Sequence, residues 1–150
     1  MIMDKYSEFA DAESLNTGGA GTYNIGDVID LGEIGRDLGQ GQPMYLVVTM
    51  DTAATSGGSA TGVFQVVSDS TATPSTDGTA TLHARTYAIP VATLVAGNRY
   101  VIPLPAHDPT YERYLGFQQV TAVAAFTAGK VNAFLTLDPI GWKPYPDASN

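Results

Sequence analysis

The chain has 150 residues, which fits a single domain, and it has no cysteine, which excludes disulfides and thiolate metal sites. Fifteen acidic and seven basic residues give a net charge of −8, which opposes binding to nucleic acid and to anionic membranes. Only 15% of the residues are charged, and 16 glycines and 9 prolines interrupt the chain, so the composition favours short strands over helices. No apolar run has the length of a secretory signal or a membrane span, so we expect a protein made in the cytoplasm.

An acidic segment opens the chain, because eight of the fifteen acids but only two of the seven bases lie in the first 40 residues. Residues 4–15 could form one or two helical turns with Tyr6 and Phe9 on one side, but such a stretch is too short to be a stable helix alone. The glycines that follow form a hinge. We therefore predict residues 1–22 as an N-terminal arm, either docked or flexible, and residues 23–150 as the folded domain.

From residue 23 onward, apolar residues alternate in short runs separated by turn residues. The predicted strands cover residues 25–31, 44–51, 63–68, 81–89, 99–104, 113–120, 122–127 and 131–137. Residues 44–51 are apolar on both faces and should form a central strand that is covered on both sides. Residues 52–62 and 69–79 are predicted as exposed loops, and Ala128-Gly129-Lys130 as a tight turn. About eight short strands at this spacing predict an all-β sandwich.

The C-terminal tail, residues 138–150, is irregular and rich in aromatic residues and proline. Trp142 and Tyr145 need something to cover them. They either close the end of the sandwich or lie in an interface, where Trp and Tyr are over-represented.

The two histidines are the first candidates for catalysis. His83 lies within a predicted strand and His107 in a loop, and neither has a second histidine at a metal-ligand spacing. A Ser-His-Asp triad can occur in any chain order, but no serine lies in a Gly-x-Ser-x-Gly turn. We interpret both histidines as structural and predict no catalytic residue and no cofactor.

Four acids lie among glycines after the hinge: Asp27, Asp30, Glu33 and Asp37. Clustered carboxylates can form a calcium loop, but their spacing does not match the 12-residue calcium-binding template. We interpret them as solvated loop acids or as partners of Arg36, and we predict no metal site.

Ten segments together resemble a known family. In chain order they are DAESL at 11–15, VIDLG at 28–32, RDLGQG at 36–41, PMYLVV at 43–48, AIP at 88–90, LVAG at 94–97, VIPLP at 101–105, ERYLG at 112–116, AGKV at 128–131 and FL at 134–135. Their order and spacing resemble the capsid cement (decoration) proteins of tailed phages, of the Bordetella-phage type, over nearly the whole chain. The resemblance implies a jelly-roll fold, binding to the major capsid protein on the outside of an icosahedral head, self-association, and no catalysis.

The expected contacts with the shell or with a second copy lie in three segments. They are Tyr6, Phe9 and Leu15 of the arm, Arg36 and Asp37 of a glycine-rich loop, and Trp142 and Tyr145 of the tail. If the arm orders only on a partner, deleting residues 1–16 should leave the melting temperature nearly unchanged. Whether the unit is a dimer or a trimer is left open.

Two other classes of function compete with this interpretation. A carbohydrate-binding or receptor-binding β-sandwich would use exposed aromatic side chains and loop acids, with or without calcium. A small esterase or glycosidase ranks third, because no carboxylate pair or triad stands out.

Overall fold

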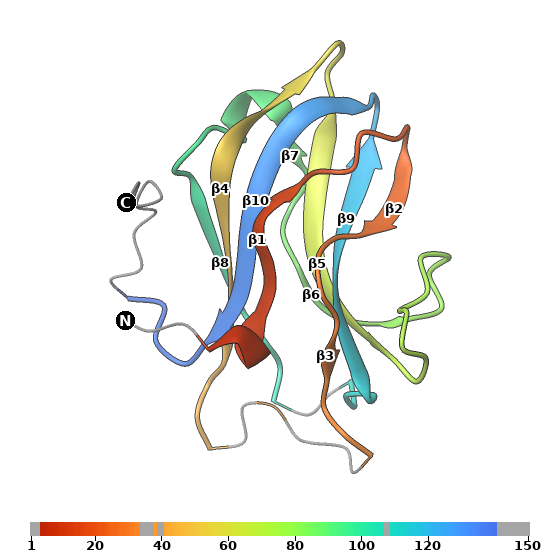
Figure 1. Cartoon of the computed structure of the whole chain (residues 1–150), viewed down its shortest axis with the longest axis vertical. Helices are drawn as coiled ribbons and strands as arrows, with labels where there is room; N and C mark the ends of the chain where they lie inside the picture. The colour runs from red at the N-terminus through yellow and green to blue at the C-terminus, as the bar shows by residue number, and fades with distance from the viewer. Residues whose placement is uncertain (1–3, 34–37, 39–40, 107–108, 141–150) are drawn as a thin grey trace.

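The computed structural model describes residues 4–33, 38, 41–106 and 109–140. These residues form ten antiparallel strands in two sheets that pack face to face (Figure 1). The strands are β1 (Glu8–Ser14), β2 (Gly21–Asn24), β3 (Ile29–Asp30), β4 (Tyr45–Ser56), β5 (Thr61–Asp69), β6 (Thr81–Arg85), β7 (Ile89–Pro90), β8 (Arg99–Pro103), β9 (Tyr114–Ala122) and β10 (Phe126–Thr136). Two short 3₁₀ turns, η1 (Lys5–Ser7) and η2 (Val91–Thr93), accompany them, and no helix in the described residues is long and apolar enough to cross a membrane.

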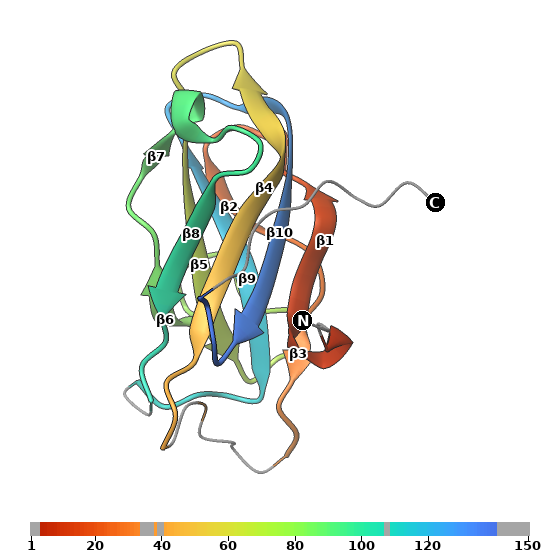
Figure 2. The ribbon, with the colours of Figure 1, turned by 90° about the vertical axis from the view of Figure 1, so that its left-hand side faces the viewer.

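The strand order is that of a jelly roll. One sheet runs β1-β10-β4-β8, and the other runs β2-β9-β5-β6, with β3 beside β9 and β7 beside β5. Because β2 and β3 share one place and β6 and β7 share another, the ten strands fill eight positions, four in each sheet. Figure 2 shows the four-stranded sheet with β8 and β1 at its two edges. The all-β sandwich and its jelly-roll order are thus confirmed.

The predicted N-terminal arm is an edge strand of the sandwich, so the domain boundary at residue 23 is wrong. β1 pairs with β10, and Phe9 and Leu15 are buried in the core at 1% and 2% exposure. Register shifts along β1 and a positive φ of 47° at Ala12 interrupt the two-residue alternation that marks a strand. Helical turns were predicted over residues 4–15, but only η1 forms, and the side chain of Asp4 caps it.

The predicted turn at residues 128–130 is wrong because these residues lie within β10, and the strand predicted at residues 122–127 contains the actual turn between β9 and β10. The chain reverses at residues 123–125, where Val123 has a φ of 70° and the amide of Ala124 donates to the carbonyl of Ala122. Gly129 instead sits at a bulge with a φ of 137°, and a Cβ there would lie 2.9 Å from Ala54 Cα. The glycine therefore serves close packing of β10 on β4.

The predicted exposed loop at residues 52–62 is mostly strand. β4 extends to Ser56 and β5 begins at Thr61, so only four residues connect the two strands, and Ala54 and Ala60 are buried. Small side chains are needed where β4 ends and β5 begins because the packing there is tight. A Cβ on Gly62 would lie 3.2 Å from the ring of Phe126. The expectation that residues 44–51 are covered on both faces is confirmed, since every residue from Leu46 to Met50 is buried.

Three aromatic rings join the two sheets at the centre of the core. Phe9 of β1 stacks on Phe117 of β9 at 6.1 Å between ring centroids, and Phe117 stacks on Phe64 of β5 at 5.7 Å. Each ring is almost fully buried, and large buried aromatic side chains dominate core energetics. β1 is therefore part of the central packing and not an appendage.

The loop after β5 is largely exposed, as predicted, but it is anchored to the outer face of the six-stranded sheet. Pro74 is buried there, and a Cβ on Gly116 would lie 2.7 Å from its ring. The carboxylate of Asp69 accepts the amides of Thr71 and Ser75, and these hydrogen bonds lower its pKa to about 2. Gln118 adds a hydrogen bond of 3.0 Å to the carbonyl of Ser75.

Candidate interaction surface

The seven residues predicted to make contacts fall into three groups in the structure: one is exposed, two are buried in the core, and four lie outside the described residues. Tyr6 lies in η1 with 87% of its surface exposed. Phe9 and Leu15 lie in the core, so they are not free to contact a partner while the sandwich is intact. The other four lie outside the described residues: Arg36, Asp37, Trp142 and Tyr145.

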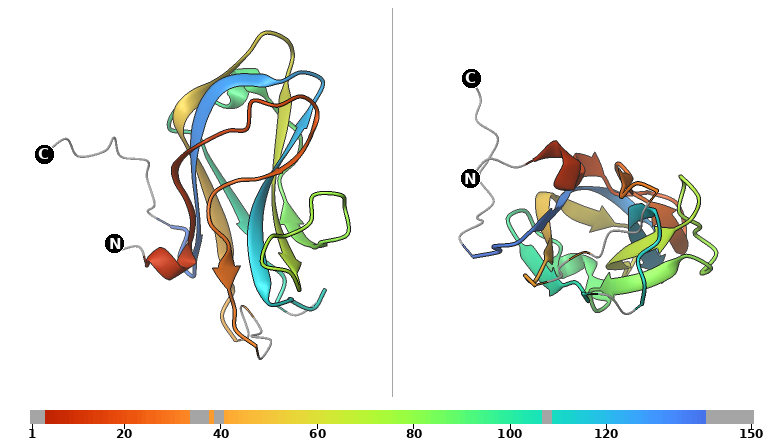
Figure 3. Two further views of the ribbon diagram at one scale, coloured as in Figure 1. Left: turned by 45° about the vertical axis from the view of Figure 1, so that its right-hand side comes forward. Right: turned by 90° about the horizontal axis from the view of Figure 1, so that it is seen from below.

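η1, β3 and the end of β10 lie at the same end of the sandwich (Figure 3). An open, mainly apolar groove lies between them. Its volume is about 1040 Å³. Apolar side chains line it, among them Leu31, Met44 and Leu135. Exposed apolar side chains also line it: Tyr6, Val28 at 36% exposure and Leu137 at 46%.

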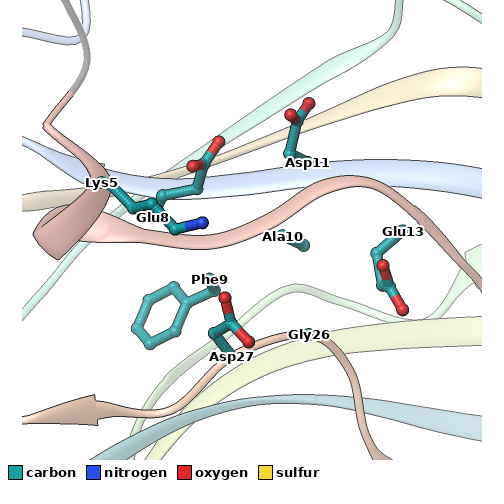
Figure 4. A pocket seen from close by; sticks show the side chains of 8 residues that line it. All are labelled: Lys5, Glu8, Phe9, Ala10, Asp11, Glu13, Gly26 and Asp27. Atoms are coloured by element: carbon teal, nitrogen blue, oxygen red, sulfur yellow. The ribbon is translucent and has the colours of Figure 1, made fainter.

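A smaller, acidic hollow of about 240 Å³ adjoins this groove (Figure 4). Four carboxylates and one amine line it, from Glu8, Asp11, Glu13, Asp27 and Lys5. Figure 4 shows Glu8 and Asp11 on one side of the β1 ribbon and Glu13 and Asp27 on the other. Lys5, Glu8 and Asp27 line both hollows, so the two form a continuous surface.

Glu8 is repelled by two other carboxylates of this hollow, those of Asp11 and Asp27. Partial burial raises the pKa of Glu8, and the charges of Asp11 and Asp27 raise it further, while Lys5 opposes the effect. Among the described residues, none of the four carboxylates forms an ion pair within 4.0 Å. The hollow is therefore a place where an added positive charge is favourable.

The backbone around Gly26 fixes the shape of the hollow. Gly26 has a φ of +71°, and a Cβ there would lie 2.0 Å from the carbonyl oxygen of Phe9. The amide of Asp27 donates to that same oxygen at 2.6 Å. The segment between β2 and β3 is therefore held directly against β1, which brings Asp27 beside Glu8.

The acid Asp30 has a partner that the sequence did not predict. Its carboxylate accepts two hydrogen bonds from Arg113, both at 2.9 Å, and Arg113 lies over the ring of Tyr114. The Arg113 guanidinium, helped by the amide of Gly32, lowers the pKa of Asp30 to about 2. Arg113 is the observed partner of Asp30, while Arg36 lies outside the described residues. In the described part of the chain no three His, Asp or Glu side chains gather in a way that could hold a metal ion.

His83 forms a buried polar cluster with Ser68 and Tyr111. Ser68 Oγ forms a hydrogen bond of 2.7 Å with His83 Nε2 and also accepts the amide of Glu112 at 2.9 Å, so the hydroxyl links the imidazole to the segment before β9. The imidazole stacks on Tyr111 at 3.9 Å, and burial lowers the pKa of His83 to about 4. Ser68 has no exposed surface, so its hydroxyl cannot meet a substrate without rearrangement. His107, the other histidine, lies outside the described residues.

The chain matches a protein-family model. No curated protein matches the chain. The family model Bbp16 matches residues 9–135, which run from the second residue of β1 to the penultimate residue of β10 and so cover both sheets. The chain belongs to the Bbp16 family, a family of Bordetella phage proteins.

Proposed function

We propose that this protein is a capsid decoration, or cement, protein that binds the outer surface of an icosahedral phage head. The observation that carries the proposal is the match of residues 9–135 to a phage family, on a chain whose segments resemble cement proteins. The jelly-roll order and the net charge of −8 agree with it, because an acidic protein suits a position away from packaged DNA.

The proposed mechanism is stabilisation by binding and involves no chemical reaction. A protein that binds assembled capsid subunits, but not dissociated ones, favours the assembled shell by mass action. Many copies on one lattice allow weak single contacts to suffice, particularly if the protein self-associates as a dimer or trimer. The partner is then the major capsid protein.

The test uses phage heads assembled without this protein. Purified protein is mixed with the heads and pelleted, and head rupture on heating is followed with a DNA-binding dye. We expect saturable co-pelleting and a higher rupture temperature, whereas heads that already carry the protein should bind no more. Absence of co-pelleting at concentrations up to the millimolar range would overturn the proposal.

Glycan or receptor binding is the competing function. The observation that favours it is the exposed ring of Tyr6 beside an open groove, since aromatic rings can stack on sugars. A glycan array measured with and without a chelator distinguishes glycan binding from the capsid role. Selective binding that a Tyr6→Ala variant loses would favour glycan recognition over the capsid role.

A further inference from the structure

Three of the nine large apolar side chains that are exposed in the described residues line a single groove. Tyr6, Val28 and Leu137 all line the groove, and they continue into a lining of buried or half-buried apolar residues. The groove is at the upper end of the roughly 300–1000 Å³ typical of small-molecule sites, and it is open, which suits several side chains of a protein segment. Contiguous exposed apolar surface of this kind marks an interaction site.

The charge beside the groove indicates the chemistry of the partner. Glu8 and Asp27 lie where the groove meets the acidic hollow, and Asp11 and Glu13 extend the negative charge along β1. Lys5 is the single base that lines either hollow in the described residues. Complementary charge across an interface raises the association rate and excludes wrong partners.

A second copy of this chain is a poor occupant of the same surface. A two-fold contact places the same patch of both copies face to face. Here it would place four carboxylates of one copy against four of the other, with one lysine on each side. The repulsion favours a different protein as the occupant.

We propose that the groove and the acidic hollow form one docking surface for a segment of the shell protein, which inserts apolar side chains into the groove and places Lys or Arg over the carboxylates. The identity of the partner rests on the proposed function. The chemistry of the segment, apolar with flanking basic residues, rests on the lining of the two hollows.

The experiment measures the binding of fluorescently labelled protein to heads assembled without it. Leu137→Asp places a charge in the groove, and Asp27→Lys reverses a charge at its border. The matched controls are Val95→Asp, whose side chain is 44% exposed near η2, and Asp77→Lys in the loop after β5. We expect each surface variant to weaken binding about tenfold and each control to change it less than about twofold. Melting temperatures verify that all four variants are folded.

The salt dependence and a cross-link complete the test. Raising the salt concentration should weaken binding of the wild type more than binding of Asp27→Lys, because salt screens exposed charges. A photo-reactive benzoylphenylalanine at position 6 should cross-link to a shell-protein segment that contains Lys or Arg.

The outcomes separate the inference from the proposed function. If the wild type does not bind heads, the proposed function fails. If the wild type binds and Leu137→Asp and Asp27→Lys bind equally well, the function stands and the docking surface is wrong. Equal loss in surface and control variants, or a cross-link to a second copy, also overturns the docking surface.

Discussion

Gly26 lies where a side chain would collide with the backbone of the neighbouring strand. A Cβ would approach the carbonyl oxygen of Phe9 to 2.0 Å, and the φ of +71° disfavours any residue with a side chain. We expect Gly26→Ala to lower the free energy of unfolding by about 1–3 kcal/mol or more, measured by urea denaturation. Gly57→Ala is the control, because nothing lies within 4 Å of the position that its added methyl group would take and its φ is not positive. Equal stabilities of the two variants would contradict the argument.

His83 makes stability depend on pH in a defined window. Its pKa is about 4 in the folded protein against an ordinary value of 6.5, so between these values the unfolded chain binds a proton that the folded protein does not. Stability should therefore fall as the pH drops from 6.5 to 4, with no further loss from this group below 4. We expect His83→Gln to flatten the free energy of unfolding over that window, and equal slopes for both proteins would refute this.

Two carboxyls give the internal control for that experiment. Asp30 and Asp69 have pKa values of about 2 against an ordinary 3.8, because Arg113 stabilises the first charge and backbone amides stabilise the second. Their contribution is present above pH 3.8 and is lost as the pH falls toward 2. Wild type and His83→Gln should lose stability in parallel there.

At the scale of the element, the question is whether β1 makes the first 16 residues necessary for the stability of the sandwich. Because Phe9 stacks in the central core, deleting residues 1–16 should lower the melting temperature sharply or prevent folding, contrary to the expectation for a flexible arm. Loss of a buried Phe alone costs about 3–5 kcal/mol. Deleting residues 1–7 leaves β1 intact and is the control, for which circular dichroism should show a nearly unchanged melt. Similar melts for both deletions would show that β1 contributes little.

The strands that the sequence predicts are those with uninterrupted alternation. Residues 44–51 and 99–104 lie within β4 and β8, give or take a residue at the ends, because the first segment is apolar on both faces and the second has an apolar residue at every second position. β1 escapes prediction because bulges shift its register, and β10 is divided because a glycine needed for close packing on β4 resembles a turn residue. The omission of β1 and the extra strand predicted at residues 122–127 offset each other, so the eight predicted strands equal the eight strand positions of the two sheets. The fold class is therefore right although these two assignments are wrong.

The candidate site is predictable only in part, because it forms where separate elements end together. The sequence predicts Tyr6 as a contact residue of the arm and shows the acidic bias of the first 40 residues. It places Val28 and Leu137 in strands, with nothing to show that their side chains meet across a groove. The Gly26 contact with β1, which creates the acidic hollow, involves residues 17 positions apart and leaves no pattern in the sequence.

At the scale of the whole molecule, the free edges of the sheets limit how copies can associate. β8 is an edge strand of five residues that pairs with β4 without a register shift, whereas β1 is bulged and β6 pairs with a shift. The fourth edge strand, β2, is also regular but has four residues. A regular edge is the best template for pairing with another chain, and lysine on an edge strand opposes such pairing. If the protein forms a homo-oligomer, we expect β8 to contact its counterpart in a second copy.

Light scattering on two matched variants tests this association. Val101→Lys on β8 and Leu82→Lys on β6 replace side chains of nearly equal exposure, 38% and 39%. We expect the wild type and Leu82→Lys to give the mass of an oligomer, while Val101→Lys shifts the equilibrium toward the monomer, because its charge must be desolvated at the contact. If only Leu82→Lys dissociates the oligomer, the contact between copies lies at β6 and not at β8. If the wild type is a monomer at all concentrations up to the millimolar range, the protein does not self-associate in solution. In that last case the proposed capsid role would require that the copies meet only on the head, where the capsid lattice sets their spacing.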